Sequence, residues 1–499
     1  MRGRDSVMDT GDGQQRGEAV KSVADVDPLE LSRRHPEWSA AQPMTRLQKG
    51  VMIGLALGAV VAFALVPLRT AQTLIGLCTL FYVVSTLYKF AVIRASLSPS
   101  AILRFSPEEI AGAEPREWPV YSVLVPMYKE PETLKQMVAA LTAMDYPADK
   151  KDVQILLEAD DDLTLNAARA LTLPPGFRVT EIPPSFPRTK PKACNIGLYL
   201  AKGDYLVIYD AEDLPEKDQL KKAVLAFEAS PQNVVCVQSR LNYYNPRQNV
   251  LTRWFTAEYS AWFDLQLPGL AAMGAVIPLG GTSNHFKTNV LRDLMGWDAY
   301  NVTEDCDLGV RLGRAGFATR MLETTTWEEA CSVVPFWIKQ RTRWQKGYIQ
   351  TWFVHMRQPW KLARELGVVN FLHYQLLVGG GPFSVLINPI FWAMALVWFV
   401  FRPEGVSHLF PGPVFAAGAA CLFLGNFVFI YINLLGCCKR KNDDLMGWAL
   451  LTPIYWLMMS YSGWRAFLQF FRDPFVWEKT QHGLVKGGSG KQSAGGNGQ

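Results

Sequence analysis

Cysteine is scarce in this sequence, and its eight residues show no metal-ligand spacing. A structural zinc site needs cysteine or histidine ligands in close, separated pairs. Cys437 and Cys438 are directly adjacent, an arrangement that suits neither such a site nor an unstrained disulfide. The sequence therefore predicts reduced thiols, and with them a location in the cytosol or within the membrane.

Charge of either sign is also limited. The sequence has 50 Lys and Arg against 45 Asp and Glu, which leaves a formal net charge of +5 over 499 residues. So small an excess does not indicate a nucleic-acid partner. We also expect no signal peptide, because residues 1–45 are polar and the first apolar run starts only after Lys49.

Charged residues are absent from long blocks, and these blocks predict membrane spans. No Asp, Glu, Lys or Arg lies between Lys49 and Arg69, or between Arg69 and Lys89. Each block suffices for a helix that crosses a hydrocarbon layer of about 30 Å. We expect a transmembrane hairpin over residues 50–94 and a second transmembrane helix pair over residues 379–438. Lys and Arg at the outer ends of both pairs predict that these ends face the cytoplasm.

Two further segments combine apolar and aromatic residues. Residues 333–378 mix aromatic side chains with Lys and Arg, which predicts helices that lie in the membrane interface. The segment 445–471 leaves two alternatives, because its apolar part is long enough for a fifth span. Its aromatic residues, Tyr455 and Trp456 among them, favour an interfacial helix.

Residues 118–332 have the pattern of an α/β domain. Short apolar runs at 120–128, 153–159, 203–213 and 233–241 predict buried strands. The stretches between them carry one apolar face and predict helices. This alternation predicts a mostly parallel sheet that is covered by helices on both faces.

Two acidic groups in this domain each have two explanations. Asp210 and Glu212 follow the apolar run LVIY, where hard oxygen ligands could hold a divalent cation on a diphosphate. The same stretch could simply begin a helix. Glu304 and Asp305 could favour a helix dipole, or an aspartate there could act as the general base toward an acceptor hydroxyl.

A third acidic group closes the predicted strand at 153–159. Glu158 and Asp160 could mark a solvated turn, as acidic runs usually do. A carboxylate at the end of a strand can also bind a nucleobase N–H or ribose hydroxyls.

The stretch QRTRW at residues 340–344 places two arginines, an amide and an indole close to the predicted membrane helices. Anchoring to lipid headgroups is one explanation. Binding of a phosphorylated ligand at the membrane surface is the other, since arginine binds phosphate in a fixed bidentate geometry.

Taken in order, these motifs resemble the signature of the membrane-integrated family 2 glycosyltransferases, which include cellulose, hyaluronan and mannan synthases. VPMYKEP, KPKACN, LGGTSN and TEDCDLG lie around the carboxylates, and QRTRW follows as the family's Q-x-x-R-W. The resemblance covers about residues 118–482, and cellulose synthase-like, XagB-like bacterial proteins form the most similar branch. It implies a GT-A fold, a nucleotide-sugar donor that is usually a UDP-sugar, a Mg²⁺ or Mn²⁺ ion, and inversion to a β-linkage.

The resemblance also implies roles for residues at matching positions. Nucleotide-sugar binding would fall to Tyr128, Glu130, Glu158 (with Asp160 as a shifted alternative), Lys192, Asp210, Gln340 and Arg343. Asp210 and Glu212 would bind the metal, with Asp213 as a competing ligand.

At the acceptor end, the resemblance implies that Asp305 is the catalytic base, with Glu304 beside it. Trp344 and the loop residues Gly281 and Thr282 would face the acceptor. Arg341 is the member of QRTRW without a role in this scheme, and it is a candidate to face the lipid.

The sequence PFVWEKTQHG near the carboxyl end resembles the gating loop that closes over bound nucleotide in cellulose synthases. The gating-loop-like segment spans 472–484, and the residues implied in it are Trp477, Lys479, Thr480 and His482. A juxtamembrane anchor is the alternative role for Trp477 and Lys479. Residues 1–45 and the flexible tail 485–499 have little to bury and are expected to be disordered.

Together these features predict an inverting β-glycosyltransferase that extends a polysaccharide at the inner membrane and is coupled to export. The catalytic domain and both termini would lie in the cytoplasm. LGGTSN lacks the cysteine of cellulose synthases, which leaves the polymer open. A non-processive enzyme with a lipid acceptor is one alternative, and a channel or transporter with a nucleotide-sensing domain is another. An export partner or a homo-oligomer is left open.

Overall fold

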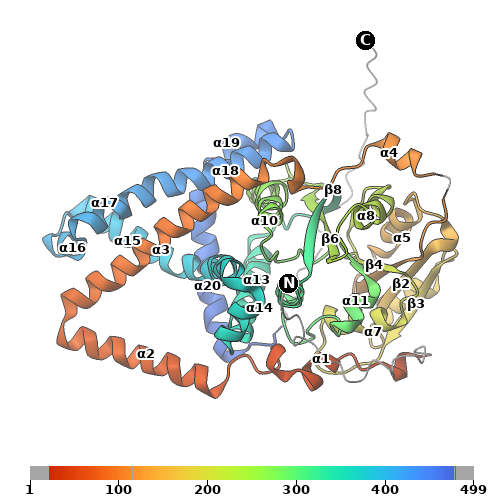
Figure 1. Cartoon of the computed structure of the whole chain (residues 1–499), viewed down its shortest axis with the longest axis horizontal. Coiled ribbons are helices and arrows are strands. Elements are labelled where there is room, and N and C mark those ends of the chain that lie inside the picture. Colours follow the sequence, from red (N-terminus) through yellow and green to blue (C-terminus); the bar gives the residue numbers. More distant parts are fainter. Residues whose placement is uncertain (1–21, 115, 477, 479–499) are drawn as a thin grey trace, which may run out of the picture.

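The computed structural model describes residues 22–114, 116–476 and 478. An α/β domain occupies one side of the molecule, and a group of long helices extends from it on the other side (Figure 1). All eight cysteines are free thiols, as their spacing predicted.

The α/β domain is built on an eight-stranded sheet with the order β3-β2-β1-β4-β7-β6-β8-β5. Its strands are β1 (Tyr121–Met127), β2 (Lys151–Glu158), β3 (Phe177–Ile182), β4 (Tyr205–Ile208), β5 (Leu214–Pro215), β6 (Val234–Tyr243), β7 (Asn284–Lys287) and β8 (Ala318–Glu328). Strands β3, β2, β1 and β4 are parallel, whereas β7 runs antiparallel to both β4 and β6. The prediction of a mostly parallel sheet is therefore correct for the first half, and the second half is mixed.

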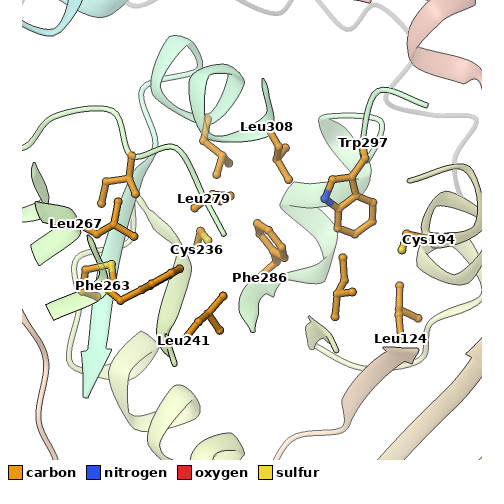
Figure 2. Close-up of a cluster of buried hydrophobic side chains, with 14 of the residues drawn as sticks. Leu124, Cys194, Cys236, Leu241, Phe263, Leu267, Leu279, Phe286, Trp297 and Leu308 are labelled. Atoms are coloured by element: carbon orange, nitrogen blue, oxygen red, sulfur yellow. The ribbon is translucent and has the colours of Figure 1, made fainter. Parts of the chain in front are cut away.

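Helices cover both faces of the sheet because successive side chains of each strand point to opposite faces. On one face, Val123 and Val125 of β1 pack with α5 (Leu134–Thr142), α6 (Asp162–Arg169) and α8 (Gln219–Glu228). On the other face, Leu124 packs in a cluster with α7 (Lys190–Leu200) and with α9 to α12. Those helices are α9 (Val250–Ala261), α10 (Leu267–Ala272), α11 (Thr288–Asp293) and α12 (Glu304–Arg314). Figure 2 shows part of this second cluster, which contains Leu124 of β1, Cys194 of α7 and Leu308 of α12.

Four helical stretches in the described part of the chain are long and apolar enough to cross a membrane. They are α2 (Arg46–Leu65), α3 (Pro67–Ser96), the run from α14 (Pro359–Tyr374) to α15 (Gly380–Phe401), and the run from α17 (Gly412–Ala420) to α18 (Asn426–Lys439). Gly367 has a φ of 76° and breaks α14. Three of the stretches lie where a span is predicted, whereas the third begins at Pro359, within the segment 333–378 that was predicted to lie in the interface.

Helix α20 (Thr452–Arg472) is not among these four stretches. One of its sides is buried, and it packs against α13 (Val334–His355), which carries QRTRW. Its exposed side carries apolar and aromatic residues, among them Leu457, Trp464 and Leu468, so both alternatives for segment 445–471 stay open. The shorter helices are α1 (Glu30–Arg34), α4 (Pro107–Gly112), α16 (Glu404–Leu409) and α19 (Met446–Ala449).

Candidate active site

Strand β4 ends in a tight turn that presents Asp210 and Glu212. The carboxylate of Asp213 accepts a hydrogen bond from the Asp210 backbone N–H at 2.8 Å, so it closes the turn from inside. The hydroxyl of Thr282 donates to the same carboxylate and to the Ile208 carbonyl. Asp210 and Glu212 are half-buried at the carboxyl end of the strand, whereas Asp213 is buried.

The two residues of the predicted acceptor loop, Gly281 and Thr282, have different positions relative to this turn. Thr282 is only 2% exposed, and its hydroxyl supports the Asp213 turn, so it lies behind the site. Gly281 lies at the surface of the site, because a Cβ atom on it would be 3.5 Å from Oδ2 of Asp305. Asp213, which the sequence left as a competing metal ligand, is turned inward.

Negative charge is concentrated around the turn. Burial and the charges of Asp210 and Glu212 raise the pKa of Asp213 well above its usual value. Glu328, at the end of β8, also has a strongly raised pKa because of burial and the charges of Asp213, Asp210 and Glu212. Glu328 was not predicted as a site residue, because the sequence of β8 does not show a clear strand pattern. Such a cluster favours a bound cation.

The donor atoms of the turn fit Mg²⁺ or Mn²⁺. Asp210 and Glu212 provide hard carboxylate oxygens, which both ions prefer. Across residues 22–114, 116–476 and 478, no group of three or more His, Cys, Asp and Glu side chains is arranged to hold a metal. Two carboxylates match a site that substrate phosphates complete.

Glu304 and Asp305 are the first residues of α12, and Asp305 lies next to Gly281, where a Cβ atom would be 3.5 Å from its Oδ2. Glu304 is buried, and burial together with the Asp305 charge raises its pKa to about 7. Burial also raises the pKa of Asp305. Oδ1 of Asp305 accepts the Cys306 backbone N–H at 2.7 Å, which fixes the orientation of the carboxylate.

Helix α13 holds the loop that precedes Asp305. Arg343 donates to the Val302 carbonyl at 3.2 Å, and Gln350 accepts the Val302 backbone N–H at 3.2 Å. A Cβ atom on Gly347 would lie 2.2 Å from the Thr303 hydroxyl, so only glycine allows this close approach. The helix that carries QRTRW therefore positions the predicted base.

A buried ionic network supports α12 from behind. Asp307 accepts from Arg311 at 2.8 Å and contacts Nε2 of His355 at 2.9 Å. Nη1 of Arg314 lies 2.8 Å from Nδ1 of the same imidazole. This arrangement requires a neutral His355 with its proton on Nε2, in agreement with a pKa lowered by burial.

The predicted donor residues lie at the ends of β1 and β2. Glu158 is buried and forms an ion pair with the fully buried Lys192 at 2.9 Å. Asp160 is exposed and forms an ion pair with Arg188. Tyr128 and Glu130 follow β1 and are half-buried. The ion pair between Lys192 and Glu158 is therefore buried beneath the predicted donor site.

A different lysine reaches the carboxylate of the β4 turn. Lys190 forms an ion pair with Asp210, and its ammonium donates to the Gly281 carbonyl at 2.7 Å. Burial would lower the pKa of Lys190, but the charges of Asp210 and Glu304 outweigh it and raise the pKa. The sequence analysis missed this residue, although KPKACN places it at the start of a helix.

The QRTRW side chains divide between the site and its support. Arg341 is buried, forms an ion pair with Glu258, and donates to the Tyr455 hydroxyl at 3.0 Å. It therefore does not face the lipid, because α20 and α9 cover it. Oε1 of Gln340 is buried and finds no hydrogen-bond partner within the described residues. Trp344 lies half-buried against Tyr259 at a ring distance of 6.2 Å.

The described start of the gating-loop-like segment is held by α13 and α20. Lys346 donates to the carbonyls of Asp473 at 3.2 Å and Val476 at 2.8 Å. Arg465 of α20 forms an ion pair with Glu478. Trp477, Lys479, Thr480 and His482 lie outside the described residues.

A cavity of about 890 Å³ leads from the site into the long helices. Its lining includes Gly281, Asp305 and Trp344 at the site, and Phe410 and Gly412 among the long helices. Phe410 follows α16 and Gly412 is the first residue of α17, and Figure 1 shows these two helices at the end of the helix group away from the sheet. The cavity therefore runs along the length of the helix group.

Comparison with known proteins identifies the α/β domain. Residues 118–347 match the family described as Glycosyltransferase like family 2. The chain is 27% identical over 256 residues to probable glucomannan 4-beta-mannosyltransferase 7 of Oryza sativa subsp. japonica, covering 49% of this chain and 44% of that protein. It is 27% identical over 297 residues to beta-monoglucosyldiacylglycerol synthase of Synechocystis sp., covering 57% and 61%. The chain thus spans only about half of the length of these curated relatives.

A solved structure shows the same fold. Mannosyltransferase PcManGT from Pyrobaculum calidifontis, in complex with GDP-Man and Mn²⁺, superposes with a TM-score of 0.51 at 18% identity, over 81% of this chain and 99% of that one. The sheet, which is parallel in its first half and mixed in its second, thus belongs to the GT-A fold that the sequence resemblance implied. Residues 118–347 therefore match the glycosyltransferase family 2 model and have a GT-A fold.

Proposed function

We propose that this chain is a divalent-cation-dependent, inverting β-glycosyltransferase of the cellulose synthase-like type. It transfers a sugar from a nucleotide sugar, most simply a UDP-sugar, to the end of a growing polysaccharide. The observation that carries this proposal is the cavity, which begins at Asp305 and continues among the long helices.

At the donor end, Asp210 and Glu212 hold a Mg²⁺ or Mn²⁺ ion, as PcManGT was solved with Mn²⁺ and GDP-Man. The ion supplies positive charge to the diphosphate when it is bound. The charges of Glu304, Asp305 and Asp210 act on the pKa of Arg343, so its guanidinium lies near the donor end of the site, where it would bind the departing diphosphate.

At the acceptor end, Asp305 takes the proton from the attacking hydroxyl. The hydroxyl oxygen bonds to the anomeric carbon from the side opposite the diphosphate, and the bond to the diphosphate breaks. Configuration is inverted as a result. The indole of Trp344 lines the cavity and offers an apolar face to the acceptor ring.

The chemistry of the cavity wall suits a glycan. Helix α3 lines it with Thr79, Tyr82, Ser85 and Thr86, which share one face of the helix at spacings of three and four residues. Amide and hydroxyl groups from α15, α18 and α20 face the same space: Ser384, Asn388, Asn426, Asn433 and Ser460. The hydroxyls of Ser85 and Ser460 are buried and find no partner within the part of the chain that the structure describes. A buried hydroxyl without a partner is costly, and a glycan in the cavity would supply hydrogen bonds to these groups.

Indole rings add the second feature of a glycan path. Trp262, Trp392, Trp398 and Trp456 line the cavity, and each offers an apolar face with a polar edge. We further propose that the four long helices cross the inner membrane, with the catalytic domain and both termini in the cytoplasm. Lys and Arg at the outer ends of the helix pairs support this orientation.

A lipid acceptor is the second candidate, because one curated relative is named beta-monoglucosyldiacylglycerol synthase. The two candidates differ in their product. Purified full-length protein in lipid nanodiscs is incubated with Mn²⁺ and labelled UDP-sugars, and the products are sized. A ladder of labelled oligosaccharides supports the polysaccharide, whereas one sugar on a lipid supports the second candidate. Absence of transfer from every nucleotide sugar contradicts both.

A further inference from the structure

Lys190 occupies the centre of the site, between the metal-binding turn and the predicted base. Its ammonium contacts Asp210 on one side and the Gly281 carbonyl at 2.7 Å on the other. A Cβ atom on Gly281 would lie 3.9 Å from this ammonium and 3.5 Å from Oδ2 of Asp305. The lysine therefore stands where donor and acceptor have to meet.

The backbone on both sides of Lys190 is fixed. The hydroxyl of Thr189 donates to the Ala299 carbonyl at 2.8 Å. Lys192, two residues further, is fully buried in its ion pair with Glu158. Lys190 is the first residue of α7, and only 17% of its side chain is exposed. A long side chain on a fixed backbone places the ammonium reproducibly in the site and still allows its end to move.

The contact between Lys190 and Asp210 conflicts with metal binding. Asp210 is one of two carboxylates available to the divalent cation, and Lys190 already neutralises it. A divalent cation on Asp210 repels an ammonium at this distance, because like charges interact strongly in a partly buried site. The ammonium then has to leave Asp210 for another negative group.

We propose that Lys190 is a mobile cation of the donor site. It neutralises Asp210 while the site is empty, and it moves to the diphosphate of the nucleotide sugar when a divalent cation takes Asp210. During transfer, the electron pair of the broken sugar–oxygen bond passes to the diphosphate, and the ammonium stabilises this new negative charge. The acceptor proton goes to Asp305. This role rests on the proposed nucleotide-sugar transfer and adds a specific residue to it.

The proposal predicts opposite effects on two ligands when the charge is removed. In Lys190→Met, Mn²⁺ binds more tightly to the nucleotide-free protein, because the competing ammonium is gone. UDP binds more weakly to the Mn²⁺-loaded protein, by on the order of tenfold for one lost charge-assisted hydrogen bond. Lys190→Arg keeps the charge and retains most of the UDP affinity.

The test uses purified full-length protein, with Mn²⁺ binding measured by electron paramagnetic resonance and UDP binding by calorimetry. Lys202→Met is the matched control, because Lys202 is exposed in the same domain. Tighter Mn²⁺ binding with weaker UDP binding in Lys190→Met supports the proposal. Equal affinities, or loss of both ligands together, overturn it, since a merely structural lysine would weaken both. A wild-type protein that binds neither Mn²⁺ nor UDP contradicts the proposed function itself.

Discussion

At the scale of single residues, the adjacent carboxyls of Glu304 and Asp305 set the expected pH dependence. Burial raises the pKa of both carboxyls, and the pKa of Glu304 rises to about 7. Adjacent groups of this kind titrate as a pair, so a proton on the pair reduces the population of the ionised base. The pair loses this proton as the pH rises through neutrality.

We therefore predict that kcat/KM falls as the pH drops through about 7, the pKa of Glu304. In Glu304→Gln, Asp305 no longer has a negative neighbour, so its pKa decreases and the acidic limb moves to lower pH. A pH profile of sugar transfer for both proteins measures the shift. An acidic limb at the same pH in both would show that Glu304 does not influence the base.

Residue types were predictable from the sequence, but their contacts were not. The pattern KPKACN indicated a lysine in the donor site, yet only the fold shows that Lys190 reaches Asp210 while Lys192 is buried on Glu158. Thr282 belongs to a motif that resembles an acceptor loop, but its hydroxyl donates a hydrogen bond to Asp213. Arg341 pairs with Glu258, which lies far away in sequence. Such partners are set by tertiary packing, which local pattern does not encode.

At the scale of elements, the contact between α12 and α13 matters most for catalysis. Gly347 of α13 allows Thr303 to approach, and Arg343 binds the neighbouring Val302 carbonyl. The spacing between TEDCDLG and QRTRW thus has a structural reason. Arg343 of QRTRW binds the loop that precedes α12, and α12 carries Glu304 and Asp305 of TEDCDLG.

We predict that Gly347→Ala lowers both stability and transfer. The added Cβ atom would lie 2.2 Å from the Thr303 hydroxyl, so the two helices have to separate. Overpacking of this kind costs about 1–3 kcal/mol. Thermal unfolding and kcat are measured beside Gly112→Ala, a control at the end of α4 where a Cβ atom meets nothing within 4 Å. Unchanged kcat in Gly347→Ala would show that this contact does not position Asp305.

Strands with a continuous apolar run were predictable from the sequence, whereas the short strand β7 and the polar strand β8 were not. The runs at 120–128, 153–159, 203–213 and 233–241 all contain strands. Strand β8 was missed because its sequence, ATRMLETTTWE, is mostly polar and shows neither a long apolar run nor a regular polar–apolar alternation. Strand β7 was missed because it has only four residues, and its antiparallel pairing makes the second half of the sheet mixed.

At the scale of the whole molecule, the cavity joins the catalytic domain to the long helices. Blocks without charge were enough to predict these helices, since each must bury its backbone polar groups internally. The cavity itself was not predictable, because it depends on how α3, α15 and α18 pack together. The polar face of α3 becomes meaningful only when the structure shows that it lines this space.

We predict that Ser85→Phe shortens the product without abolishing sugar transfer. Ser85 lines the cavity, so a large ring there narrows the path at a distance from the chemistry. The control is Leu87→Phe on the same helix, because Leu87 is 63% exposed on the outer surface. Products are sized by gel filtration. Product of unchanged length from Ser85→Phe would show that the glycan does not pass this residue.

The central claim is that Asp305 acts as the base in transfer from a nucleotide sugar bound at Asp210 and Glu212. The most direct test compares Asp305→Asn with wild type for two quantities, UDP-sugar binding in the presence of Mn²⁺ and the rate of sugar transfer. We predict that binding is retained while transfer falls by about 100-fold or more, since a positioned general base contributes at least that factor. Wild-type transfer by a folded Asp305→Asn protein would contradict it.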